Sequence, residues 1–147
     1  MTEWSAVLGG VELALSGHRE LGEKALRECW SDTTWSDHAQ RCVIAHYLAD
    51  LQLDLAAEVE WDERTLAEFF HVSNADLAPI GIPSAKGFAP SLHLNVGDGY
   101  LRTGRVDDAW KHLESGELAL QVVQWDGYLQ FVEQGLRRLR QRLAERA

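Results

Sequence analysis

Apolar residues recur at intervals of three and four along most of this 147-residue chain. Because an α-helix turns once in about 3.6 residues, this spacing places each set of apolar side chains on one helix face. No segment keeps the strict alternation of a half-buried strand for long enough to matter. We therefore expect an all-α protein. The first and last apolar stripes are Trp4, Leu8, Val11 and Leu15, and Leu129, Val132, Leu136, Leu139 and Leu143.

Breaks in this pattern divide the chain into helices that pair as hairpins. Ser16-Gly17 and Thr103-Gly104 each end an apolar stripe, and glycine is the usual residue just after a helix. We expect antiparallel hairpins at about residues 3–30, 36–70 and 91–121. A final helix at about 127–145 should cap them, with its leucine seam against the preceding hairpin. The whole of 1–147 is expected to form a single domain.

The segment 71–90 differs from its surroundings. It contains all three prolines of the chain, with Gly81 and Gly87 between them. Proline lacks a backbone N–H and constrains the residue before it, so no long helix should cross this segment. We expect a long loop with one turn near residues 75–77. Two forms stay open: a plain loop, or a lid folded over a surface.

A repeat motif occupies residues 91–120. Gly97, Tyr100, Gly104 and Ala109 stand at relative positions 0, 3, 7 and 12. Small residues at Gly97 and Ala109 let two helices approach closely, Gly104 forms the turn and Tyr100 fills the crossing. This spacing resembles the tetratricopeptide repeat (TPR), although Gln121 replaces the proline usual after its second helix. Looser matches start at Gly10 and Ala45, and the distance from Ala45 to Gly97 exceeds one 34-residue period by about the length of the Pro/Gly insertion.

The chain as a whole is similar to short bacterial TPR proteins, through segments such as RCVIAHYLADLQ and DGYLQFVEQGL. The resemblance implies an α-solenoid that holds a peptide or partner helix in a concave groove. Because catalytic motifs are missing from the sequence, we expect no enzymatic activity. In such repeats the first helix of each hairpin lines the groove. Carried over by spacing, the partner-binding residues would be His46, Asp50, Asn95, Asp98 and Arg102. The Lys/Asn set that grips peptide carboxylates is missing.

The charge of the chain limits which classes of partner it can bind. The net charge of −9 repels phosphate backbones, so we do not expect nucleic acid to bind. Residues 54–68 hold six acids and one arginine, whereas residues 133–147 hold five arginines and two glutamates. A mixed or acidic groove favours a basic or amphipathic protein partner. The basic last helix could also dock on an acidic face of a second copy, giving a homo-oligomer, or both faces could simply be solvated.

Other features indicate a reduced, cytoplasmic protein. Cys29 and Cys42 lack metal-binding spacing and are expected in the core. The N-terminus lacks the basic region of a signal peptide, and no apolar run is long enough to cross a membrane. Eleven arginines against three lysines hint at a GC-rich bacterial genome. Among six tryptophans, Trp35 stands in a loop and is expected to be exposed as a binding anchor.

Catalytic and cofactor motifs are missing from the sequence. It contains no GxSxG elbow, no HExxH and no phosphate-binding glycine loop, so we expect neither catalytic residues nor a cofactor. One alternative from another class is a helical-bundle metalloprotein. His46 and Asp50 lie four apart on one expected helix, and Glu58 and Asp62 could face them from the next. The plainer interpretation is a groove histidine that bonds within its own helix.

Overall fold

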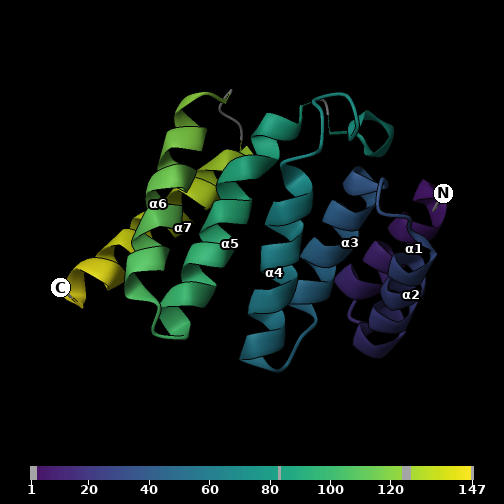
Figure 1. The fold of residues 1–147 in the computed structure, drawn as a ribbon, viewed down its shortest axis with the longest axis horizontal. Helices are drawn as coiled ribbons and strands as arrows, with labels where there is room; N and C mark the ends of the chain where they lie inside the picture. The colour runs from purple at the N-terminus through teal and green to yellow at the C-terminus, as the bar shows by residue number, and fades with distance from the viewer. Residues whose placement is uncertain (1–2, 83, 124–126, 147) are drawn as a thin grey trace. The chain divides into compact units, whose positions relative to one another are not determined.

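The computed structural model describes residues 3–82, 84–123 and 127–146, and in this part of the chain it contains helices and no strand (Figure 1). The all-α prediction is confirmed. The chain divides into two compact units, residues 1–83 and 84–147, which are described separately below. Whether they act as a single domain, as the sequence suggested, stays a prediction. The α-helices are α1 (Trp4–Leu15), α2 (Arg19–Asp32), α3 (His38–Asp50), α4 (Leu55–Phe69), α5 (Ala89–Arg102), α6 (Val106–Gln121) and α7 (Gly127–Glu145).

Unit 1 consists of two helical hairpins, α1–α2 and α3–α4, with α3 packed against both helices of the first (Figure 1). Glycines bring α1 and α2 close together. A Cβ atom on Gly22 would lie 2.8 Å from the backbone nitrogen of Ala14, and one on Gly10 would lie 2.9 Å from Leu26 Cδ2. Gly17 makes the turn between them in the left-handed region, at φ 88°.

Helix α3 forms the centre of unit 1 and is buried along most of its length. Cys42 lies on it, fully buried, and burial raises the pKa of the thiol to about 12. Cys29 on α2 is also buried, and burial, with nearby Asp32, raises its pKa. Both are free thiols in the core, which confirms the prediction.

The Pro/Gly segment is shorter than expected. A turn spans residues 74–77, as predicted, and two short 3-10 helices follow: η1 (Ala78–Ile80) in unit 1 and η2 (Ala85–Phe88) in unit 2. Helix α5 already begins at Ala89, so the prediction that the loop runs through Pro90 is wrong by two residues. Proline is tolerated in the first helical turn because the N–H it lacks would have no partner there.

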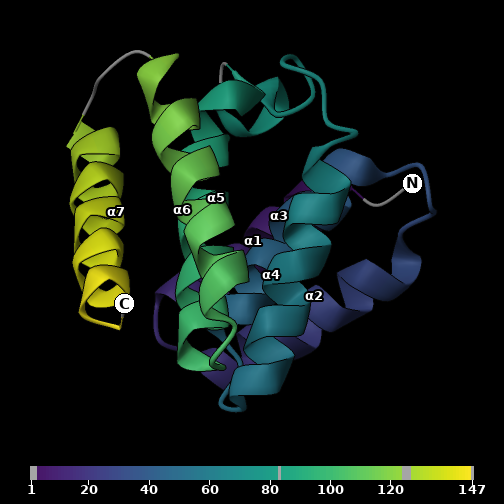
Figure 2. The ribbon, with the colours of Figure 1, turned by 60° about the vertical axis from the view of Figure 1, so that its left-hand side comes forward.

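Unit 2 consists of the hairpin α5–α6 and the last helix, α7, which lies beside both (Figure 2). The predicted seam of α7 is confirmed: Leu136, Leu139 and Leu143 are almost completely buried, and Leu129 and Val132 nearly so. Glycines again set the spacing, since a Cβ atom on Gly97 would lie 3.0 Å from Leu139 Cδ2. Among the helices of the described segments, none combines the length and the apolar character that a membrane crossing requires.

Candidate partner-binding surface

His46 and Asp50, two of the predicted groove residues, lie four residues apart on α3. The His46 imidazole is edge-on to the neighbouring Tyr47, with 4.9 Å between the ring centroids. Burial lowers the pKa of His46 to about 4, so its imidazole is neutral at neutral pH. Asp50 ends the helix with an exposed side chain, although partial withdrawal of its carboxyl from water raises its pKa.

Asn95, Asp98 and Arg102, the other three, lie on α5 in unit 2. Arg102 Nη1 donates to Asp98 Oδ2 over 3.3 Å, one turn along the helix. Arg142 of α7 donates to the other oxygen, Asp98 Oδ1, over 2.7 Å. The carboxylate of Asp98 therefore joins two helices of its own unit, a contact that the sequence did not predict. The five residues divide between the two units, and the groove that would unite them stays a prediction.

The alternative metal site gains no support. Among the residues that the structure describes, no three His, Cys, Asp or Glu side chains are gathered so that they could hold a metal ion. Asp62, one of the proposed ligands, is itself buried on α4. His46 is held neutral, as a ligand must be, but this alone does not make a site.

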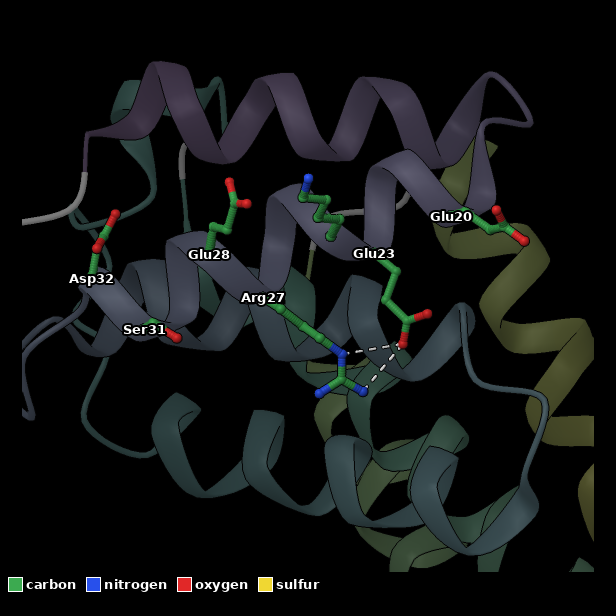
Figure 3. Close-up of a pocket in the computed structure, with 7 residues that line it drawn as sticks. Glu20, Glu23, Arg27, Glu28, Ser31 and Asp32 are labelled. Atoms are coloured by element: carbon green, nitrogen blue, oxygen red, sulfur yellow. Dashed lines mark hydrogen bonds and ion pairs between the residues drawn. The ribbon is translucent and has the colours of Figure 1, made fainter.

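An open depression follows the outer side of α2 in unit 1 (Figure 3). The opposite side of the helix is buried through Gly22, Leu26 and Cys29. Figure 3 shows Glu20 and Asp32 at opposite ends of the depression, with Arg27 turned back toward Glu23. Its lining residues are Glu20, Glu23, Lys24, Arg27, Glu28, Ser31 and Asp32.

Part of the positive charge within this depression is neutralised by an ion pair between two of its own lining residues. Arg27 Nη2 and Nε donate to Glu23 Oε1 over 3.1 and 3.3 Å. The Arg27 guanidinium also lies 5.7 Å from the centre of the Trp61 ring. Four carboxylates against Lys24 and an already paired Arg27 give the depression a negative potential.

Acidic charge is concentrated in unit 1 as a whole. Residues 1–83 contain fifteen Asp and Glu against five Lys and Arg, a net charge of −10. Residues 84–147 contain eight acids against nine bases, a net charge of +1. In unit 2 the basic last helix pairs with its own neighbours, since Arg140 binds Glu117 and Arg142 binds Asp98. These pairs occupy two of the arginines that we considered for docking on a second copy.

A network of polar and aromatic side chains connects the ends of α2, α3 and α4. His38 Nδ1 is 2.7 Å from Glu68 Oε2, and Arg41 Nε donates to Glu68 Oε1 over 2.9 Å. Burial acts to raise the pKa of Glu68, but the hydrogen bonds from His38 and Arg41 outweigh it, and the pKa is lowered. The carboxylate therefore stays ionised and fixes both partners. Glu68 lies 30 residues from His38 and 27 from Arg41 in the sequence, so no short-range sequence pattern predicts this network.

Trp35 lies next to this network and is 82% exposed, which confirms its predicted exposure. Its role as a binding anchor stays a prediction. Its ring is edge-on to His38, with the centroids 6.5 Å apart. His38 also stacks on the ring of His71, with the two ring centroids 4.6 Å apart. Phe70, which precedes His71 in the sequence, is 72% exposed. The ends of these helices thus present aromatic rings to solvent, of which the sequence indicated only Trp35.

Unit 2 contains a second histidine pair that sequence reasoning missed. His93 of α5 and His112 of α6 face each other, with their Nδ1 atoms 3.1 Å apart. Burial, together with the nearby His112, lowers the pKa of His93 to about 4. One ring must donate and the other accept, so the contact requires that they are not both protonated.

Comparisons with protein-family models, curated proteins and solved structures find no match to this chain. Its function therefore has to be inferred from the surfaces described above.

Proposed function

We propose that the chain is a non-enzymatic interaction protein of TPR-like hairpins whose acidic unit binds a basic or amphipathic peptide or helix of a protein partner. The observation that carries the proposal is the open acidic depression along α2, in a unit with a net charge of −10. A positively charged partner gains long-range attraction to such a surface, whereas nucleic acid and acidic proteins are repelled.

Internal similarity between two hairpins supports the repeat architecture. Gly17 and Gly104 stand seven residues after Gly10 and Gly97, and both have positive φ, 88° and 84°. An equivalent backbone hydrogen bond closes each helix at the turn: His18 N donates to Leu13 O over 2.9 Å, and Arg105 N donates to Tyr100 O over 2.8 Å. Two segments 87 residues apart in the sequence thus form the same type of turn, with the same glycine conformation and an equivalent hydrogen bond.

Helix α7 supports the same architecture from the other end. Its apolar seam is buried against α5 and α6, and its remaining surface is largely polar and exposed. Repeat arrays require such an end helix, because an apolar surface on the last repeat would otherwise face water.

Peptide binding measured by calorimetry tests the proposal. Two synthetic 18-residue helical peptides would share the same leucine face and carry lysine on one and glutamate on the other. We expect the lysine peptide to bind, and to bind less tightly as salt is raised from 50 to 500 mM, because exposed charges are screened. Equal binding of both peptides, or no binding of the lysine peptide, would contradict the proposal.

A further inference from the structure

Three side chains in contact at one end of unit 1 form an aromatic surface that we name the Trp35 shelf: Trp35, His38 and His71. Phe70 directly precedes His71 in the sequence. Trp35 and Phe70 are 82% and 72% exposed. His38 contacts the rings of both Trp35 and His71. Large aromatic side chains are enriched among the residues that dominate binding energy at protein interfaces.

The loop that carries Trp35 is held in place on both sides. Thr33 Oγ1 donates to Trp30 O over 2.6 Å, and Arg41 Nη1 donates to Thr33 Oγ1 over 2.8 Å. After Trp35, the buried Asp37 accepts from Thr34 N over 2.9 Å, while Asp37 N donates to Thr34 O over 3.1 Å. The indole is therefore presented on an ordered loop, which lowers the entropy lost when a partner binds.

The loop on the other side of His38 is ordered by the same pattern. Asp76 Oδ2 accepts from Ser73 N over 2.8 Å, and Asp76 N donates to Ser73 O over 3.1 Å. These hydrogen bonds with Ser73 lower the pKa of Asp76, with a smaller contribution from His38. The carboxylate of Asp76 is consequently ionised near the shelf. His38 itself is fixed by Glu68, so the shelf is built before any partner arrives.

Charge around the shelf determines which partner fits. Asp32 and Asp76 are exposed, and Asp32 also ends the acidic depression on α2. The nearby cation, Arg41, is already used, because it binds Glu68 and lies 3.9 Å from the centre of the Trp30 ring. An aromatic face rimmed by carboxylates attracts cationic groups through both its ring quadrupole and its charge.

We propose that the Trp35 shelf is the anchor point for a cationic amphipathic segment of a protein partner. An Arg or Lys side chain of the partner lies over the indole of Trp35, and an apolar side chain contacts Phe70. The rest of the segment follows the acidic depression of α2 beyond Asp32. This inference rests on the proposed function and adds to it the anchor and the direction in which the partner lies.

The lysine peptide with the leucine face, called the lysine–leucine peptide from here on, is labelled with fluorescein to test the anchor. Fluorescence anisotropy measures its binding to the parent protein and to three variants. Trp35→Ala removes the shelf's most exposed ring. Phe131→Ala is the matched control, since Phe131 is an aromatic residue of α7 in unit 2 and is 75% exposed. Glu20→Gln with Glu28→Gln removes charge from the depression and leaves the shelf and Asp32 unchanged. None of these side chains is in the core, and circular dichroism melting verifies that each variant folds.

We expect Trp35→Ala to weaken binding at least about tenfold, as loss of a central aromatic anchor does. Phe131→Ala should leave binding unchanged, and the charge variant should weaken it and reduce its salt dependence. If the charge variant weakens binding but Trp35→Ala does not, the shelf is not the anchor, although the acidic unit still binds basic partners. If the parent protein binds no peptide, both proposals fail. If its mass in solution is that of a dimer and Trp35→Ala makes it monomeric, the occupant is a second copy and the partner proposed here is wrong.

Discussion

Replacing Gly22 by alanine would place a methyl group against the backbone of the neighbouring helix. The added Cβ would lie 2.8 Å from Ala14 N, closer than real Cβ contacts come, and 3.1 Å from Ala14 Cα, closer than most of them come. Because these are backbone atoms, no side chain can rotate away, and α1 and α2 must separate. We therefore expect Gly22→Ala to destabilise unit 1 even though alanine is the better helix former.

Gly9 provides the matched control for that change. It lies inside α1, and a Cβ atom there would meet nothing within 4 Å. Both substitutions gain about 1 kcal/mol of helix propensity. At Gly22, overpacking costs about 1–3 kcal/mol, toward the upper end against backbone atoms. The expected net changes are about 1 kcal/mol of stabilisation for Gly9→Ala and about 1–2 kcal/mol of destabilisation for Gly22→Ala.

Thermal unfolding followed by circular dichroism measures the difference. A change of 1 kcal/mol shifts the melting temperature by about 2–4 °C in a chain of this size. Gly9→Ala should therefore melt a few degrees above the parent and Gly22→Ala several degrees below it. If Gly22→Ala melted as high as Gly9→Ala, the close approach of α1 and α2 would be refuted.

Three further predictions concern both units. Gly97→Leu should lower the melting temperature strongly, because even a Cβ at Gly97 lies 3.0 Å from Leu139 Cδ2 and 3.5 Å from Ala109 O; a parent-like melt would show that the repeat register is wrong. The free energy of unfolding, measured by urea titration, should fall between pH 7.5 and 5.0. The folded state lowers the pKa of His46 and His93 from 6.5 to about 4 and so favours their neutral forms. The stabilisation from these neutral forms is complete above pH 6.5 and is lost toward pH 4. The exposed His18 supplies the control: His18→Gln should keep that pH dependence and His46→Gln should reduce it, and no difference between them would count against the assignment. Asp50→Ala combined with Asp98→Ala should change the melting temperature little, because the exposed pairs of Asp98 with Arg102 and Arg142 are worth under about 1 kcal/mol; retention of full peptide affinity would exclude these two residues from the binding surface.

The helices of this protein follow from local sequence pattern. Apolar spacing identified all seven α-helices of the described segments, because it directly encodes which face of each helix is buried. One error in their bounds came from Pro90, because proline ends a helix in most positions but is accommodated in a first turn. The exposure of Trp35 was predictable for a similar reason, since a tryptophan in a loop between two helices belongs to neither buried stripe.

Contacts between helices were not predictable in the same way. His38 meets Glu68 across 30 residues, His93 meets His112 across 19, and Asp98 meets Arg142 across 44. Each pairing depends on the register between two helices, which periodicity within one helix does not specify. The sequence therefore predicted Asp98 as a groove residue from its spacing on α5 but missed the arginine of α7 that binds it.

Nuclear magnetic resonance of the full chain tests the central claim, that unit 1 binds a cationic segment along α2 with Trp35 as its anchor, most directly. Tryptophan indole N–H signals are few and well separated, and each can be assigned by substitution. Titration with the lysine–leucine peptide should shift the Trp35 indole signal and the backbone amides of α2 first, while the amides of α6 and α7 stay in place. Shifts confined to α5, α6 or α7, with Trp35 and α2 unaffected, would contradict it.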